Sequence, residues 1–150
     1  MPQPAGFRLL AIASNGTVPE VAIPSDLAPI IEATKTLYME IGHEPPWISY
    51  VATSDGVAVG SGAFVGAPKD GSVEIAYFTL EGSRRQGFAV RTAGVLIEIA
   101  KRADPAISIW AKTSPELSAS TRILERNGFR RTGLTLDHEI GDAWVWTLGG

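Results

Sequence analysis

The sequence predicts an α+β fold of about six or seven strands and about three or four helices. Apolar residues recur at helical spacing in two long segments, and short β-branched runs bounded by turn residues lie between and after them. The chain has 150 residues, 45% of them hydrophobic, which suffices for one buried core. We therefore expect a single domain over residues 1–150.

The N-terminal half is predicted to hold one helix and four strands. Between Ser25 and Ile41, apolar residues recur at helical spacing, Asp26 could cap the helix, and Gly42 ends it. The run Ser54-Asp55-Gly56 separates two β-branched segments and predicts a hairpin. The four strands are expected over residues 7–13, 48–53, 57–65 and 72–79.

The C-terminal half is predicted to alternate between helices and strands. A long amphipathic helix runs from Phe88 to Arg102, and a strand follows over residues 106–111. Ser114-Pro115-Glu116 offers a capping hydroxyl, a proline at the first helical position and an acid, so we expect a helix from there to Gly128. The remaining strands, residues 130–136 and 143–148, should form an antiparallel pair.

Composition excludes several classes of protein. The net charge of −3 lacks the basic excess of a dedicated nucleic-acid binder. There are no cysteines, hence no disulfide, no thiolate metal site and no cysteine nucleophile. No signal peptide and no apolar stretch long enough to cross a membrane is evident, so we expect a cytoplasmic protein. His43 and His138 stand apart with no metal-binding spacing, and no metal is expected.

The run Arg84-Arg85-Gln86-Gly87-Phe88-Ala89 lies where a strand gives way to the long helix from Phe88. The N-terminus of a helix exposes unpaired N–H groups and the positive end of the helix dipole. Gly87 lets the backbone approach an anion closely, and the two guanidinium groups match phosphate oxygens. The sequence therefore predicts a pyrophosphate site, although a solvated basic turn has the same composition.

Two motifs together resemble a known family. The pattern Arg84-x-x-Gly87-x-Ala89 after a strand resembles the signature of the GCN5-related N-acetyltransferases (GNAT). The helix end at residues 120–129, S-T-R-I-L-E-R-N-G-F, is similar to that of the branch containing the ribosomal-protein alanine N-acetyltransferases. The two motifs stand in the expected order and cover the region from about residue 57 to residue 147. The resemblance implies the acyl-CoA N-acyltransferase fold, with α/β/α layers and a central mixed, mostly antiparallel sheet. It also implies acetyl-CoA as cosubstrate.

The resemblance also implies which residues contact acetyl-CoA. The backbone groups of Phe78 and Thr79 would bind the pantetheine amides, at a place where the family's strand parts from its neighbour. The turn and the first residues of the helix would hold the pyrophosphate, mainly through N–H groups; these are Arg84, Arg85, Gln86, Gly87, Phe88, Ala89 and Val90.

Glu74 is the candidate general base. It lies on a mostly apolar strand, where loss of hydration makes a carboxylate more basic. In the resembled family an acid at this position often accepts the proton of the amine, directly or through water. The alternative is a structural ion pair with a lysine or arginine of a neighbouring strand.

Ser120 is the candidate acid for the leaving thiolate, as the matching serine is thought to be in the resembled branch. We expect it on the same helical face as Leu117 and Leu124. The alternative is a hydroxyl that bonds back to its own helix. Where the branch usually has an asparagine, three residues before the serine, this chain has Leu117.

The acceptor would be a primary amine, either a small molecule or a protein N-terminus. Tyr38, His43 and Trp47 fall near the end of the first helix, where family members build the acceptor pocket, although core packing explains each of them equally well. A homodimer is a further expectation from the family, with Trp144 and Trp146 as contacts or as core residues.

Two classes of function fit these residues. The first is an N-acetyltransferase in which the amine attacks acetyl-CoA directly in a ternary complex. The second is a non-catalytic acyl-CoA-binding sensor or scaffold of the same fold, in which Glu74 is only structural.

Overall fold

The computed structural model describes residues 6–137 and 141–149, and within them seven strands form one sheet of order β1-β2-β3-β4-β5-β7-β6. All neighbouring strands are antiparallel except β4 and β5, which are parallel. The predicted fold class is thereby confirmed. The strands are β1 (Phe7–Ala11), β2 (Ser49–Ser54), β3 (Val57–Phe64), β4 (Ser72–Thr79), β5 (Ser108–Thr113), β6 (Arg130–Asp137) and β7 (Gly141–Leu148).

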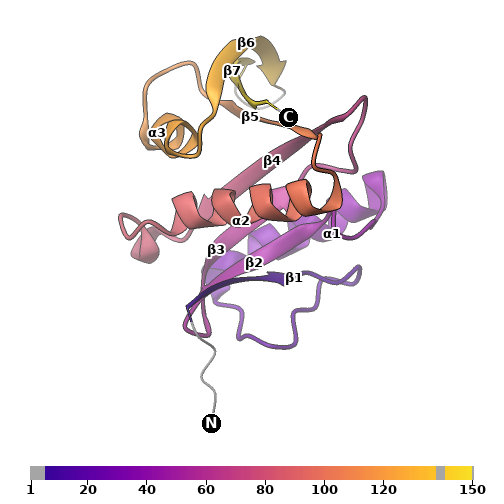
Figure 1. The fold of residues 1–150 in the computed structure, drawn as a ribbon. Coiled ribbons are helices and arrows are strands. Elements are labelled where there is room, and N and C mark those ends of the chain that lie inside the picture. Colours follow the sequence, from indigo (N-terminus) through magenta and orange to yellow (C-terminus); the bar gives the residue numbers. More distant parts are fainter. Residues whose placement is uncertain (1–5, 138–140, 150) are drawn as a thin grey trace.

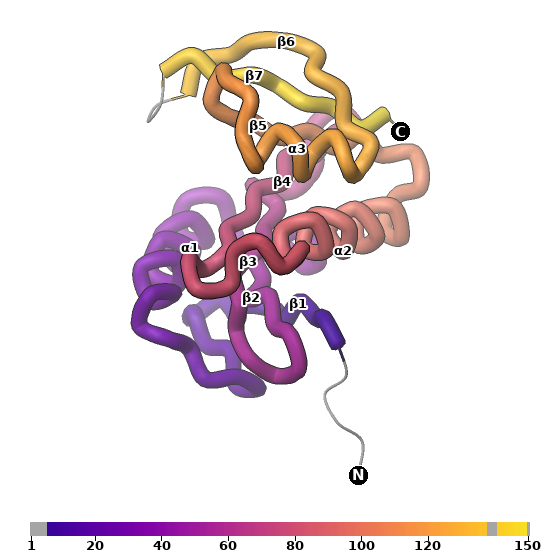
Figure 2. The backbone as a smooth tube through the Cα atoms, turned by 90° about the vertical axis from the view of Figure 1, so that its left-hand side faces the viewer, coloured from indigo at the N-terminus to yellow at the C-terminus, as the bar shows by residue number. Residues whose placement is uncertain are grey.

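The described residues contain three α-helices, α1 (Ala28–Ile41), α2 (Phe88–Ala103) and α3 (Ala119–Arg126). Figure 1 shows α2 across one face of the sheet with α1 behind it, and the side view in Figure 2 places the two helices on opposite sides of β2–β4. The unit formed by β5, β6, β7 and α3 lies beyond β4. None of the helices in these residues combines the length and apolar character needed to span a membrane.

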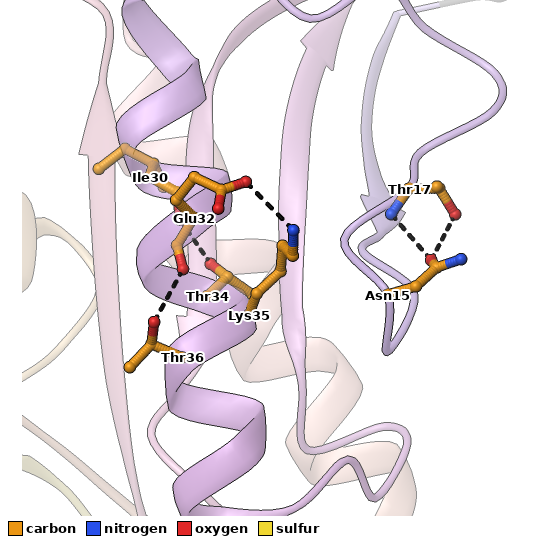
Figure 3. Close-up of polar contacts among 7 residues, drawn as sticks. All are labelled: Asn15, Thr17, Ile30, Glu32, Thr34, Lys35 and Thr36. Atoms are coloured by element: carbon orange, nitrogen blue, oxygen red, sulfur yellow. Dashed lines mark hydrogen bonds and ion pairs between the residues drawn. The ribbon is translucent and has the colours of Figure 1, made fainter.

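Helix α1 follows a short 3-10 turn at Ser25–Leu27, and no side chain caps either start, so Asp26 is not the cap that the sequence suggested. Gly42, at φ 90°, ends the helix as expected. Figure 3 shows polar contacts along this helix, among them the pair between the Lys35 ammonium and the Glu32 carboxylate at 3.3 Å. The Thr34 hydroxyl bonds back to the Ile30 carbonyl, so this side chain needs no partner elsewhere.

The core fills the space between the sheet and the two long helices. On the α2 side, a Cβ placed on Gly62 of β3 would lie only 2.5 Å from Cγ2 of Thr92. The absence of a side chain at Gly62 therefore lets α2 pack directly on the strand. One turn earlier in the same helix, the rings of Phe7 and Phe88 stack at 6.1 Å. This packing fixes the start of α2 relative to the sheet.

The start of α3 differs from the sequence prediction. Ser114 does not cap it, and residues 114–117 precede the helix, with Leu117 81% exposed. Ser118 is the cap: its extended backbone and side chain form a capping box with Thr121, whose backbone N–H donates to the Ser118 hydroxyl at 3.4 Å. The helix therefore begins at Ala119, and Leu117 shares no helical face with the residues that follow.

Candidate functional site

The sheet opens between β4 and β5. The two strands pair only over Ser72–Glu74, opposite Ser108–Trp110, while β4 continues to Thr79 and β5 to Thr113. Beyond Glu74 the strands part, and a trough of about 670 Å³ lies between β4, the start of α2 and α3. The structure thus shows a separation that the sequence alone could not.

The backbone of β4 presents hydrogen-bonding groups to this gap. Two bonds fix the pairing with β3: Val65 N–H donates to the Glu74 carbonyl at 2.9 Å, and Leu80 N–H donates to the Val59 carbonyl at 2.8 Å. Since backbone groups alternate along an extended strand, Phe78 also turns its N–H and C=O toward β3. The corresponding groups of Tyr77 and Thr79 face the gap. Phe78 lines the trough, but its backbone groups, which the resemblance implied as partners of the pantetheine amides, are directed into the sheet.

A tight turn leads from β4 into α2. Arg85 and Gly87 both have positive φ, 65° and 80°, and Gly87 is the N-terminal residue before the helix, without any side-chain cap. No acceptor in residues 6–137 or 141–149 takes the amide hydrogens of Gly87, Phe88 and Ala89. A helix start with free amides and without a capping side chain is suited to an anion.

Four arginines surround the trough from two sides. Arg84 and Arg85 come from the turn, and Arg122 and Arg126 come from α3. No acidic residue lines the trough, and none of the four forms an ion pair within the described residues. The trough therefore has a strongly positive lining. Ser120 of α3 was expected at the site, but Arg122 and Arg126 were not, although their spacing by four residues was the available signal.

Ser120 lies in the first turn of α3 and lines the trough. Its hydroxyl donates to no acceptor in the described part of the chain, so the back-bonded alternative is not observed. Its carbonyl oxygen accepts a hydrogen bond from the Tyr77 hydroxyl at 3.2 Å. Tyr77, which no sequence pattern singled out, thus connects β4 to α3 across the gap.

Glu74 lies at the closed end of the gap, in the last residue pair that joins β4 to β5. Its side chain is 15% exposed, and its carboxylate is 3.7 Å from the Lys112 ammonium, which also pairs with Asp137 at 3.2 Å. The ion pair offered as the alternative role is therefore present. Burial nonetheless raises the pKa of Glu74, while the Lys112 charge lowers it and Asp137 raises it further.

The three residues expected to bind the acceptor do not line the trough. Tyr38 is buried, and its hydroxyl donates to the Ile12 carbonyl at 2.9 Å and accepts from the Ser49 amide. His43 packs edge-on against Tyr38, with its Nε2 buried and without a partner in the described residues. Trp47 packs against Phe64 at 5.1 Å. Packing explains each of these positions.

The histidine pair contributes no visible metal site. His138 lies outside the described residues. In residues 6–137 and 141–149, no three histidine, aspartate or glutamate side chains are grouped closely enough to hold a metal ion.

Comparison with known proteins decides the family. The family model for the acetyltransferase (GNAT) domain matches residues 8–130. The chain belongs to the GNAT acetyltransferase family. It is a GNAT-type, acetyl-CoA-dependent N-acetyltransferase, as the two sequence motifs predicted. By sequence, no curated protein matches the chain.

Solved structures share this GNAT fold at low identity. RimL, a ribosomal L7/L12 alpha-N-protein acetyltransferase in complex with coenzyme A, is 14% identical with a TM-score of 0.70, covering 99% of this chain and 96% of its own. RimJ of Mycobacterium smegmatis, in complex with CoA-disulfide, is 20% identical with a TM-score of 0.66, covering 83% and 61%. The putative acetyltransferase yncA of Salmonella typhimurium, with acetyl-CoA, is 16% identical with a TM-score of 0.62, covering 96% and 94%.

Proposed function

We propose that this chain moves the acetyl group of acetyl-CoA to a primary amine by direct attack in a ternary complex. The observation that carries the proposal is the turn before α2, whose free amides at Gly87, Phe88 and Ala89 adjoin the arginine-lined gap between β4 and β5. A diphosphate at that turn would leave the pantetheine arm to run along β4. The backbone groups of Tyr77 and Thr79 would then bind its amides.

The chemistry needs a proton acceptor and a proton donor. The amine nitrogen attacks the thioester carbonyl carbon, the C–S bond breaks, and coenzyme A leaves as a thiolate. Glu74, directly or through a water molecule, would accept the proton that the ammonium loses. The unengaged hydroxyl of Ser120 would donate a proton to the thiolate and regain one from the nitrogen, which loses its extra proton as the intermediate collapses to the amide.

The two groups lie on opposite faces of β4. Because side chains alternate along a strand, Glu74 and Tyr77 point to opposite sides, and Ser120 lies beside Tyr77. The gap between β4 and β5 connects the two sides of the sheet at this point. The acyl end could therefore meet an amine that arrives from the Glu74 side while the nucleotide stays on the α2 and α3 side.

A protein N-terminus is the acceptor that we favour. RimL and RimJ share the fold, and RimL is an alpha-N-protein acetyltransferase. A short peptide also suits a gap that is open at the surface, because an extended backbone can reach Glu74 without an enclosed pocket. A homodimer stays a prediction: Trp146 is 3% exposed and donates to Thr113, so it packs within its own chain.

The test is turnover with a panel of amines. Release of coenzyme A would be monitored with acetyl-CoA and either N-terminal peptides, polyamines or aminoglycosides. Glu74→Gln should lower kcat by about 100-fold or more, since a general base contributes on that scale. Glu98→Gln, on the exposed side of α2, is the matched control and should behave as the unaltered chain. Saturable binding of acetyl-CoA without turnover on any amine would instead support the non-catalytic module.

A further inference from the structure

Two arginines of α3, Arg122 and Arg126, line the trough apart from the turn before α2. We propose that Arg122 and Arg126 bind the 3′-phosphate of coenzyme A, and that the chain thereby discriminates against forms of the coenzyme without this phosphate. The inference rests on the proposed use of acetyl-CoA.

The positions of the two arginines are fixed relative to the turn. They are four residues apart on one helix and both line the trough. The end of α3 is joined to the start of α2 by Asn127, whose side-chain amide donates to the Val90 carbonyl at 3.3 Å and to the Ile123 carbonyl at 3.1 Å. The start of α3 is joined to β4 by Tyr77. Both ends of the helix are therefore held against the walls of the trough.

The charge of the trough exceeds what a diphosphate requires. The free amides of the turn and the side chains of Arg84 and Arg85 already provide donors for a diphosphate. Arg122 and Arg126 remain on the other wall, with no acidic residue lining the trough between them and the turn. A phosphate monoester carries about −1.5 to −2 charges at pH 7, so two forked guanidinium groups match it in charge and in geometry.

Not every arginine in this part of the chain lines the trough. Arg131, five residues beyond Arg126, stacks its guanidinium on the Trp144 ring at 4.1 Å. Arg130 and Arg131 both lie outside the trough lining. The basic character of this part of the chain therefore does not by itself place an arginine at the site, and Arg130 offers an exposed control of the same residue type.

Calorimetric titration with acetyl-CoA and with acetyl-dephospho-CoA, which lacks the 3′-phosphate, tests the proposal. The unaltered chain should bind acetyl-CoA about 10- to 100-fold more tightly, the range expected for charge-assisted hydrogen bonds to a phosphate. The double variant Arg122→Gln/Arg126→Gln should lose this preference and bind the two ligands alike. Arg84→Gln should weaken both ligands by the same factor, and Arg130→Gln should change neither.

Two outcomes would overturn this inference alone, and a third would overturn the proposed function as well. Equal affinity of the unaltered chain for the two ligands would overturn the 3′-phosphate site while leaving acetyl-CoA binding intact. Equal weakening of both ligands by the double variant would also overturn it, because the arginines would then act on the diphosphate. Failure of the unaltered chain to bind either ligand would overturn the inference and the proposed function together.

Discussion

The Tyr77 hydroxyl donates a hydrogen bond to the Ser120 carbonyl oxygen at 3.2 Å, across the gap between β4 and α3. This bond sets the position of the turn of α3 that carries the Ser120 hydroxyl. Burial raises the pKa of the Tyr77 phenol, so the group stays a neutral donor over the whole physiological pH range.

Replacing Tyr77 with phenylalanine should lower activity more than stability. The lost hydrogen bond is worth about 0.5–1.5 kcal/mol of unfolding free energy. Because Ser120 would no longer be held at the gap, we expect a several-fold decrease in kcat, measured by steady-state kinetics beside urea unfolding. Tyr50→Phe is the control, since its hydroxyl bonds to the Pro46 carbonyl at 2.7 Å, away from the trough. Equal losses of activity in both variants would argue against a positioning role.

The raised pKa of Glu74 should appear in the pH dependence of activity. A carboxylate acts as a base only when it is ionised, so kcat/KM should rise with pH. The rise should be centred at a pH above the ordinary pKa of a glutamate. The stability that this carboxyl contributes has the opposite trend. Since its folded-state pKa is raised, that contribution is fully present below the unfolded pKa and is lost as pH rises through the folded one. Glu74→Gln should remove both trends.

Lys112→Gln should move this rise in activity to higher pH. The Lys112 ammonium lowers the pKa of Glu74, and without it burial and the Asp137 charge would act unopposed. The measurement is the pH profile of kcat/KM. Lys35→Gln, which removes only an exposed pair with Glu32, should leave the profile in place. An unmoved rise in Lys112→Gln would show that Glu74 is not the titrating group.

Gly87→Val should abolish acetyl-CoA binding. Gly87 has φ 80°, where a β-branched residue is strained, and the strain costs about 1–3 kcal/mol or moves the amides of the turn. Gly71→Val is the matched control, because Gly71 has φ 76° and open space at its Cβ but lies in the turn before β4. Both variants should lose stability by thermal unfolding, and only Gly87→Val should lose the binding heat. Binding that survives in Gly87→Val would exclude the turn as the anion site.

Acetyl-CoA should protect particular amides from hydrogen exchange. The amides of Tyr77 and Thr79 face the gap and should exchange quickly in the free protein, then slowly in the complex. Phe78 is the internal control, because its amide faces β3 and should be protected in both states. Mass spectrometry or NMR with residue resolution would separate the three. Unchanged exchange at Tyr77 and Thr79 would contradict the proposed path of the pantetheine arm.

The parts of the site that depend on local sequence were predictable. Gly87 and the adjacent arginines lie next to one another in the chain, so the turn before α2 and its basic side chains could be predicted directly, and its anion-binding role stays a proposal. The start of α3 was misplaced because two serines offered caps, and the capping box of Ser118 with Thr121 prevailed over the serine and proline at residues 114 and 115.

The parts that depend on contacts distant in sequence could not be predicted. The parting of β4 from β5 follows from how the two strands pair, and periodicity holds no signal for it. The partner of Glu74 was foreseen only as a basic residue of a neighbouring strand, because identifying Lys112 requires the register. The assignment of residues to the acceptor pocket was the weakest inference. Aromatic side chains such as Tyr38 and Trp47 occur both in binding pockets and in cores, and here both pack against other residues of the chain.

The short junction between β4 and β5 affects how the molecule would unfold. Only three residue pairs continue the ladder from the first four strands to β5, β7 and β6. Side-chain links such as Tyr77 to Ser120 and Asn127 to Val90 therefore carry much of the cooperativity between the halves. Three of the four tryptophans, Trp110, Trp144 and Trp146, belong to the C-terminal half. Their fluorescence would consequently report mainly the melting of that half, and acyl-CoA bound between β4 and α3 would tie its melting to that of the N-terminal strands.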